Sequence, residues 1–568
     1  IDSSKTYNIV VGDGGDSAGE NSSFDNIIAN GGAGATNETI TSDIFYVNNV
    51  RTFTEFNFKV EGVGYSNIEE KLFTNLNCNF DSPVPSIGAG STTKDPSIGK
   101  YEETNSNFYT IYNNITIGDY DSDKIYLGGG GKYGYYEQTV LSRSVYSCGR
   151  HSSGQLGRTV NNNNAIPVEI DVLANSNIVA ISSGEFHSLF LDNDGNVYSC
   201  GDNDKDQLGR VINNDNNIPI IIDTYSNLDS LIDKPNIVAI SSYDKYSLAL
   251  DENGYVYSWG EGYYGVLGLG DISNHNRPTR IDTFNDADDT PLDTIPTIVA
   301  ISAGAHNARQ SLFLDNLGSV YSCGKYNDGQ LGHGDTESYY YPTRIDNFKD
   351  LDGSPIATPV IVAISAGAKH SLFLDENGYV YSCGYGNSGR LGHGDTVHKY
   401  FPTRINTLSN IVAISAGSQH SLFLDNNRNV YSCGYVGLYG ILGRTVNNNN
   451  TIPIEITNTI GDLNIVAISA SAEHSLFLDE NGYIYACGKN YWGQLGNGKS
   501  YAINSNDYTE LTITKINALS NIVAFSISRD HSLFITADVA TAPPSSASLG
   551  GGGNAIQDGS LPGKTLSG

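Results

Sequence analysis

The chain alternates short apolar segments with polar turns, and one hairpin pattern recurs along most of its length. The segment HSLFLDENGYVYSCG, residues 370–384, has two runs of alternating apolar and polar residues around an Asn-Gly turn. This pattern predicts a β-hairpin. Close copies begin at His187, His420 and His474. A strand of the form NIVAIS precedes the hairpin, and a Gly-rich loop with Leu-Gly and a proline-containing apolar strand follow it.

The second strand of the hairpin, VYSCG or a close variant, occurs seven times, at intervals of 52, 59, 64, 60, 50 and 54 residues. Each repeat therefore supplies about four short strands, the content of one propeller blade. One blade alone leaves its faces exposed, whereas seven blades stacked around an axis bury them. The expected fold is all-β: a seven-bladed β-propeller at residues 141–540, between a Gly-rich β domain at residues 1–140 and a Gly-rich tail at residues 541–568.

The repeat frame also predicts how the ring closes. The first VYSCG strand, at Val145, has no HSLFLD strand directly before it. The last such strand, HSLFITAD from His531, has no VYSCG after it. We expect these two strands to pair, so that one blade is built from both ends of the repeat region. The tail is then expected to pack near the N-terminal domain.

The pattern S-A-G-x-x-H-S-L-F-L-D, then V-Y-S-C-G, G-x-L-G-x-G-D and P-T-R-I, resembles the repeat of the regulator of chromosome condensation family over residues 141–538. The resemblance implies a seven-bladed propeller and, from the best-known members, nucleotide exchange on a small GTPase at chromatin. Tyr246 and Gln310 depart from the pattern, because five other repeats have His there. The segment TYNIVVGDGGDSAG is similar to glycine-rich segments of phage tail fibres and surface adhesins.

The repeated His-Ser pair invites a catalytic interpretation. Neighbouring side chains in a strand point to opposite faces, so such a pair cannot share the hydrogen bond of a nucleophile and its base. We therefore expect each His to hydrogen-bond the backbone across its blade, and no catalytic residue is assigned. Six of the seven cysteines occupy one repeat position, which predicts buried thiols without disulfides. Cys78 stands alone.

The net charge of the chain argues against one class of partner. The chain has 32 Lys and Arg against 62 Asp and Glu, a net charge of -30. Such an acidic surface repels phosphate backbones, which argues against nucleic acid. Membrane insertion is not expected either, because the sequence has no apolar run of 18 residues.

Candidate sites are few, and no cofactor is expected, since VGDGGDSAG lacks the last Gly of a dinucleotide-binding loop. Asp202, Asp204 and Asp206 alternate as in a calcium loop but lack its Gly and Glu, so the expected metal is none. Aromatic residues follow the VYSCG strands and form a candidate contact face: Tyr263, Tyr264, Tyr326, Tyr385, Tyr435, Tyr439, Tyr491 and Trp492. Glycosylation sequons stand at Asn21, Asn37, Asn114 and Asn449.

The sequence supports a main hypothesis and two alternatives. The main one is a non-enzymatic binding or assembly protein, displayed on a virion or cell surface as part of a fibre, appendage or adhesin. Its partners would be other proteins, copies of itself or surface glycans, and its location extracellular. The first alternative is a guanine nucleotide exchange factor for a small GTPase, with a cytoplasmic location. The second is a secreted propeller that inhibits an enzyme or binds carbohydrate.

Overall fold

The computed structural model describes residues 143–537, apart from 161–163, 211–215, 305–309, 326, 436, 438, 445–449, 457–462 and 501–508. Within residues 1–142 it describes strands without their side chains. The chain divides into two compact units near residue 141. The predicted tail at residues 541–568 lies outside the described residues, as do Tyr326, Asn21, Asn37, Asn449 and the side chain of Asn114. The predicted domain boundaries and the packing of the tail stay predictions.

The N-terminal unit contains antiparallel and parallel strand pairs. Its strands are β1 (Tyr7–Val11), β2 (Ser22–Phe24), β3 (Ile27–Asn30), β4 (Glu38–Ser42), β5 (Phe45–Val47), β6 (Val50–Lys59), β7 (Lys100–Asn105), β8 (Phe108–Ile117) and β9 (Ile125–Gly128). They form sheets ordered β1-β4, β2-β3-β9 and β5-β6-β8-β7. The Gly-rich β domain expected at residues 1–140 stays a prediction.

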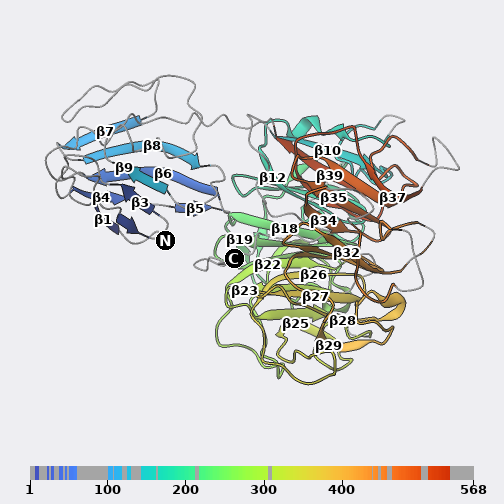
Figure 1. The fold of residues 1–568 in the computed structure, drawn as a ribbon. Coiled ribbons are helices and arrows are strands. Elements are labelled where there is room, and N and C mark those ends of the chain that lie inside the picture. Colours follow the sequence, from blue (N-terminus) through green and yellow to red (C-terminus); the bar gives the residue numbers. More distant parts are fainter. Residues whose placement is uncertain are drawn as a thin grey trace. The chain divides into compact units, whose positions relative to one another are not determined.

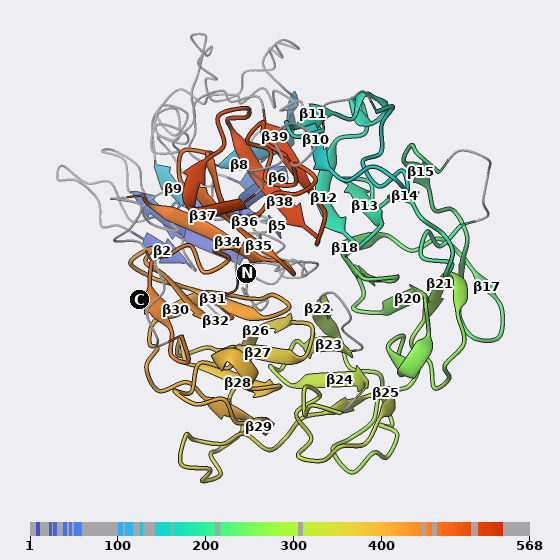
Figure 2. The same cartoon turned by 90° about the vertical axis from the view of Figure 1, so that its right-hand side faces the viewer.

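The second unit is a ring of seven sheets, numbered here as blades 1 to 7 by the order of their VYSCG strands (Figure 2). Blade 2 contains β12 (Ile178–Ser183), β13 (His187–Asp192), β14 (Val197–Gly201) and β15 (Ile220–Ile221). Blade 3 contains β18 (Ile237–Tyr243), β19 (Tyr246–Asp251), β20 (Val256–Gly260) and β21 (His275–Arg280), with β16 (Tyr225–Ser226) and β17 (Leu231–Ile232) added outside. Blade 4 contains β22 (Ile298–Ala303), β23 (Gln310–Asp315), β24 (Val320–Gly324) and β25 (Tyr339–Arg344).

The remaining blades follow the same plan. Blade 5 contains β26 (Ile361–Ala366), β27 (His370–Asp375), β28 (Val380–Gly384) and β29 (Lys399–Arg404). Blade 6 contains β30 (Ile411–Ala416), β31 (His420–Asp425), β32 (Val430–Gly434) and β33 (Ile454–Glu455). Blade 7 contains β34 (Ile465–Ala470), β35 (His474–Asp479), β36 (Ile484–Lys489) and β37 (Thr509–Lys515). Short 3₁₀ turns lie at η2 (Asp171–Leu173), η3 (Tyr263–Gly265) and η4 (Asn387–Gly389).

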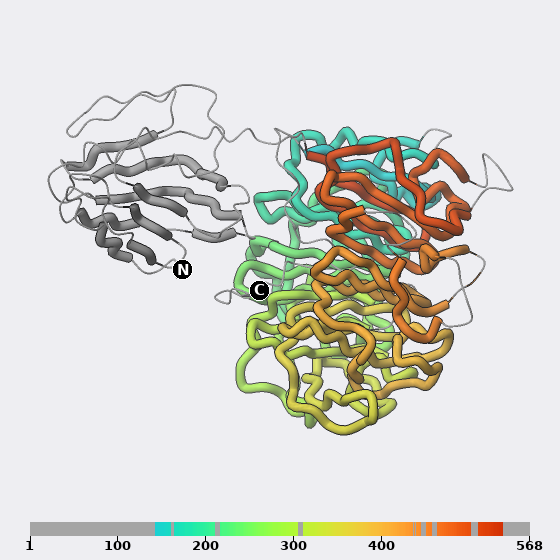
Figure 3. The backbone as a smooth tube through the Cα atoms, in the orientation of Figure 1, coloured from blue at the N-terminus to red at the C-terminus, as the bar shows by residue number. Residues whose placement is uncertain are grey.

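Blade 1 is built from both ends of the repeat region, as the sequence predicts. Its sheet has the order β11 (Val168–Glu169), β10 (Arg143–Gly149), β39 (His531–Ala537) and β38 (Ile522–Ile527). Strand β10 pairs antiparallel with β39, in a register that places Val145 opposite Ile535. Figures 1 and 3 show the red end of the ring beside its blue-green beginning. The closure gives both β10 and β39 a paired strand on each side, so neither half-hairpin is left as a free edge.

The Asp that recurs at the end of the HSLFLD strand fixes the turn that follows it in blades 2 to 7. In blade 5, Asp375 Oδ1 accepts the backbone N–H groups of Asn377 and Tyr379, both at 2.9 Å. Its Oδ2 accepts the Tyr381 hydroxyl at 3.1 Å. The same bonds recur around Asp192, Asp251, Asp315, Asp425 and Asp479. The Asp-to-Tyr spacing of the repeat is therefore a hydrogen-bonded turn that sets the register of each hairpin.

The hydrophobic core lies between blades rather than within them. Leu372 and Leu374 of blade 5, for example, share one buried cluster with Ile414 and Phe423 of blade 6. The described cysteines are all buried and free, one in every blade except blade 3. There Trp259 takes the position and donates its Nε1–H to the Gln207 carbonyl at 2.9 Å. The prediction of buried, unpaired thiols at the repeat position is confirmed for these six residues.

Candidate functional site

Two sets of loops emerge at the same end of every blade and form what we call the loop face. Alternate connections of an antiparallel sheet lie at opposite ends, so loops after the first and third strands share one end. The loops after the first strands are residues 184–186, 244–245, 367–369, 417–419, 471–473 and 528–530. The loops after the third strands begin at residues 150, 202, 261, 325, 385, 435 and 490. The predicted aromatic residues that the structure describes lie in this second set.

A belt of hydrogen bonds runs around the ring directly beneath the loop face. Each His of the HSLFLD motif reaches the Ser of the same motif in the next blade, as in His370 Nε2 to Ser421 Oγ at 2.9 Å. The other links are His187 to Ser247, His420 to Ser475, His474 to Ser532 and His531 to Ser188. Gln310 bonds Ser371 at 2.9 Å, and the Tyr246 hydroxyl bonds Ser311 at 3.1 Å. Gln310 and Tyr246, which stand where the other repeats have His, therefore complete the belt.

The belt corrects one expectation. Each His was expected to bond the backbone of its own blade, but its Nε2 partner is a hydroxyl of the neighbouring blade. The pairing of β27 and the spacing of the blades explain this, because the His and Ser of one motif point to opposite faces of the sheet. Ser421 Oγ donates to the Arg390 carbonyl at 2.7 Å, so it accepts the Nε2–H of His370. Burial lowers the pKa of His187, His420, His474 and His531 to about 3.

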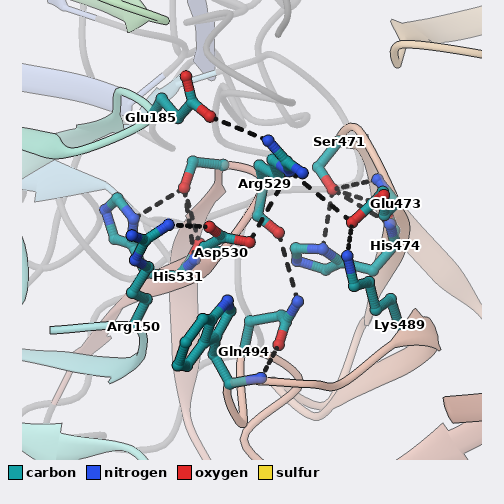
Figure 4. Close-up of polar contacts among 12 residues, drawn as sticks. Arg150, Glu185, Ser471, Glu473, His474, Lys489, Gln494, Arg529, Asp530 and His531 are labelled. Atoms are coloured by element: carbon teal, nitrogen blue, oxygen red, sulfur yellow. Dashed lines mark hydrogen bonds and ion pairs between the residues drawn. The ribbon is translucent and has the colours of Figure 1, made fainter. Parts of the chain in front are cut away.

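Above the belt, Arg529 ties the loops of three blades together (Figure 4). Its guanidinium lies 3.3 Å from Glu185 of blade 2 and 3.8 Å from Glu473 of blade 7. Glu473 also pairs with Lys489. The Arg529 carbonyl accepts the Gln494 side-chain amide at 3.3 Å. The Arg529 side chain is 33% exposed and that of Glu185 only 7%, so this ion pair is largely shielded from solvent. The network therefore presents a preformed surface where the ring closes.

Arg150 links this network to the aromatic candidates. Its Nη1 lies 3.0 Å from Asp530, which is almost fully buried. The same guanidinium lies 4.8 Å from the Phe186 ring centroid and 5.2 Å from that of Trp492. Trp492 is 40% exposed and meets Tyr491 edge-on. The side chains of blades 1, 2 and 7 thus form one mixed aromatic and charged patch.

Further aromatic residues of the loop face also carry a cation. Lys325 lies over Tyr264 at 4.6 Å, and Lys489 lies over Tyr439 at 5.4 Å. Tyr385 is contacted by Lys369 and by the buried Arg390, at 4.9 and 5.0 Å. The most exposed of the aromatic set are Tyr263, Tyr435 and Trp492. Their loops share one end of the ring, but their role in binding stays a prediction.

The weaker candidates have local structural roles. Asp202 Oδ1 accepts the Asp204 backbone N–H at 3.3 Å, and Asp206 adopts a left-handed φ of 67°. No group of three potential metal ligands occurs among the residues that the structure describes. His333 and His393 bond Ser322 and Ser382 of their own blades, at 2.8 and 2.9 Å. No helix within the described part of the chain is long and apolar enough to cross a membrane.

Sequence reasoning missed Arg150, Glu185, Glu473 and Arg529. The four residues occupy variable positions of the repeat, among them the two residues between S-A-G and H-S. Their variation within an otherwise regular repeat is the signal that marks the loop face.

Residues 144–534 match the model of the RCC1-like domain. The match covers more than half of the chain, and the chain therefore belongs to the RCC1-like domain family. The recognition of this family and of a seven-bladed propeller is confirmed. Because the match begins at residue 144, the similarity of the N-terminal segment to phage tail fibres stays a prediction.

The chain spans only part of the length of the curated relatives that it matches. The chain is 29% identical over 372 residues to the E3 ubiquitin-protein ligase HERC2 of Mus musculus, covering 65% of this chain and 6% of HERC2. It is 28% identical over 270 residues to the ultraviolet-B receptor UVR8 of Arabidopsis thaliana, covering 48% of this chain and 55% of UVR8. It is 31% identical over 232 residues to the RCC2 homologue of Danio rerio, covering 38% of this chain and 43% of that protein.

Solved structures agree on the fold. Yeast RCC1 (Prp20) bound to Kap60 gives a TM-score of 0.57 at 22% identity, over 71% of this chain and 90% of that chain. Human WBSCR16 gives a TM-score of 0.57 at 20% identity, over 69% of this chain and 98% of that chain. Another structure of Prp20p from Saccharomyces cerevisiae is described with its binding to Gsp1p and histones.

These matches overturn the main functional hypothesis. A scaffold on a virion or cell surface is wrong, because the chain belongs to a family whose matched members include a ubiquitin ligase, a light receptor and a histone-binding protein. The extracellular location is wrong for the same reason, and the cytoplasmic alternative agrees with these relatives. Glycans and further copies of the chain gain no support as partners, whereas other proteins do.

Proposed function

We propose that the propeller is a protein-binding regulator of a small GTPase, which docks on the loop face and loses its nucleotide more rapidly when bound. The observation that carries this proposal is the match to the RCC1-like domain across the whole ring, residues 144–534. The propeller would act as a binding module, without a catalytic residue of its own. The proposal for the cytoplasm as its location follows from the same relatives.

The loop face has the features of a protein interface. Protein interfaces concentrate Trp, Tyr and Arg, and these residues are the usual anchors of binding energy. The patch of Arg150, Tyr491 and Trp492 combines all three. The ion pairs of Arg529 with Glu185 and Glu473 hold the surrounding loops in place before binding. A preformed surface loses little conformational entropy when it binds.

The test is nucleotide release. A panel of small GTPases from the source organism would be loaded with fluorescent GDP, and release would be followed with and without residues 1–568 of this chain. We expect accelerated release from at least one GTPase, and slower release when Trp492→Ala replaces the wild-type protein. Leu317→Ala is the control, since Leu317 is a large apolar residue, 76% exposed, in the turn between β23 and β24 at the opposite end of the blades.

The outcome that contradicts the proposal is equally specific. If no GTPase of the panel binds or exchanges faster, the GTPase is not the partner. If Leu317→Ala weakens the effect as strongly as Trp492→Ala, the loop face is not the docking surface. Binding without faster release would retain the interface and discard the exchange activity.

A further inference from the structure

Three connections on the rim of the ring share one design. After the outer strands of blades 2, 3 and 4, the chain makes a tight antiparallel turn before it enters the next blade. The first arm of each turn lies parallel to the outer strand of that next blade, through Ser226–Thr279, Asn285–Thr343 and Lys349–Thr403. The second arm lies outside the first, through the pairs Ser226–Leu231, Asn285–Pro291 and Lys349–Pro355. The second arm is therefore the outermost edge of each sheet.

In two of the three turns, a proline on the second arm removes the backbone donor that would face an added strand. In the connection after blade 3, the hydrogen bonds Asp286 N to Thr290 O and Leu292 N to Phe284 O bracket the Asn285–Pro291 pair. The middle pair of such a ladder directs its backbone N and C=O groups away from the partner strand. Pro291 thus turns its nitrogen outward, and a proline nitrogen has no hydrogen to donate. Proline on an outer edge is a known protection against added strands.

The connection after blade 4 repeats this arrangement. Asp350 N bonds Ser354 O at 2.9 Å, and Ile356 N bonds Phe348 O at 3.1 Å. These bonds bracket the pair of Lys349 and Pro355. Pro355 therefore occupies the same outward-facing position as Pro291.

The connection after blade 2 has Leu231 at this position instead of proline. Asn227 N bonds Ser230 O at 3.0 Å, so the next pair along, Ser226–Leu231, is the one whose outer partner turns its backbone outward. Leu231 is 62% exposed and Leu228 is 51% exposed. Among the described strands, β16 alone pairs with β17, and β17 ends the sheet order of blade 3. Figure 2 shows β17 at the outer rim of the ring.

The open edge is held rigidly. Tyr225 is buried beneath it and meets the Tyr257 ring edge-on, with centroids 5.7 Å apart. The Ser226 and Thr279 hydroxyl groups lie 3.1 Å apart. Ile232, beside Leu231, packs against the buried cluster of Tyr225 and Trp259. An incoming strand would thus meet a preformed partner and would pay no cost for ordering it.

The charges around this edge indicate which kind of strand would bind there. Asp223, Asp229 and Asp233 are exposed on the connection itself. Lys234 follows and contacts Asn196 of blade 2. A strand with positive side chains would complement the three carboxylates, whereas a second copy of this acidic edge would repel them.

We propose that the outer edge of β17 is a docking site for an extended, basic segment of a partner protein, which adds to the sheet as a strand opposite Leu231. Main-chain hydrogen bonds to Leu231 would provide the affinity, and the exposed Leu228 and Leu231 side chains would contact apolar residues of the segment. This site lies on the rim and is independent of the loop face and of the GTPase proposal.

The experiment uses a labelled peptide of alternating lysine and valine and the full chain, with binding followed by fluorescence anisotropy. We expect the peptide to bind the wild-type protein and to bind Leu231→Pro at least about tenfold more weakly. Leu231→Pro copies the sister turns, so it is expected to fold, and its unfolding temperature checks this. If it does not fold, peptides with N-methylated valines provide the same test on the wild-type protein, because methylation removes the donors of the incoming strand.

Several outcomes would overturn the proposal. They are the absence of peptide binding, equal affinity for Leu231→Pro, and equal affinity of the N-methylated peptide. Equal binding of a peptide of alternating glutamate and valine would contradict the assigned charge preference. Self-association of the wild-type chain that Leu231→Pro abolishes would assign the edge to a second copy and overturn the proposed partner.

Discussion

His187 of blade 2 and Ser247 of blade 3 lie 60 residues apart in the chain, and His187 Nε2 contacts Ser247 Oγ at 2.9 Å. The same contact recurs between other neighbouring blades, so one sequence motif serves two interfaces. Its His reaches forward to the next blade, and its Ser accepts the His of the preceding blade. A motif that resembles a catalytic pair thereby holds the ring together, and its full burial removes it from any substrate.

The belt predicts a graded effect of substitution at His370. Replacing His370 by Ala removes the donor to Ser421 and leaves a cavity, so the free energy of unfolding should fall by about 1–3 kcal/mol. His370→Gln should cost less, because Gln310 makes the equivalent bond to Ser371 in the preceding blade. Urea unfolding of the two variants measures the difference. A Gln variant as unstable as the Ala variant would contradict the role assigned to the belt.

The belt also predicts a loss of stability in acid. Four of its His residues have a pKa of about 3 in the folded protein, against about 6.5 in an unfolded chain. Between these values the unfolded chain binds more protons, so the free energy of unfolding should fall as the pH drops from about 6.5 toward 3. Each His contributes up to about 1.4 kcal/mol per pH unit.

Urea midpoints at several pH values between about 5 and 7 test this prediction. Above about pH 7 these His residues should contribute no slope. His370→Gln should reduce the slope by about one proton, because burial holds the pKa of His370 well below its ordinary value. An unchanged slope would show that His370 does not titrate on unfolding.

Thiol chemistry provides a third prediction. Burial raises the pKa of Cys148, Cys200, Cys433 and Cys487 to about 12 and also raises that of Cys323 and Cys383. The thiolate is the reactive form, so these six residues should resist alkylation by iodoacetamide in the folded protein. Mass spectrometry of a Cys78→Ser variant isolates them from the remaining cysteine. Rapid alkylation of the folded variant at any of the six would show that its blade opens.

Because blade 1 is closed by β39, we expect the end of the repeat region to be essential for folding of the ring. Deleting residues 531–568 removes β39, which lies between β10 and β38, and also the His531 and Ser532 links of the belt. The truncated chain should unfold or aggregate, as followed by circular dichroism and light scattering. Deleting residues 541–568 alone is the matched control and should leave the ring folded. A stable, protease-resistant ring without residues 531–568 would refute this closure.

The sequence predicts the fold well because the information is local and repeated. Strand alternation, Asn-Gly turns and the two unpaired half-hairpins at Val145 and His531 together specify seven blades and their closure. The partner of each His could not be predicted this way, because the contact to Ser of the next blade depends on how blades stack. The Arg529 network and the open edge at Leu231 were missed for a related reason. Each lies at a position where one repeat differs from its sisters, and only the structure shows what the difference does.

The central claim is that the GTPase binds the loop face. Hydrogen–deuterium exchange of the complex with a responsive GTPase tests this claim most directly. The account predicts slower exchange in the loops at residues 184–186, 261–265, 489–493 and 528–530, which belong to one face of the ring. Exchange in the turns at residues 193–196, 252–255 and 376–379, at the opposite end of the blades, should not change. Protection of those turns, with the loops unaffected, would contradict the account.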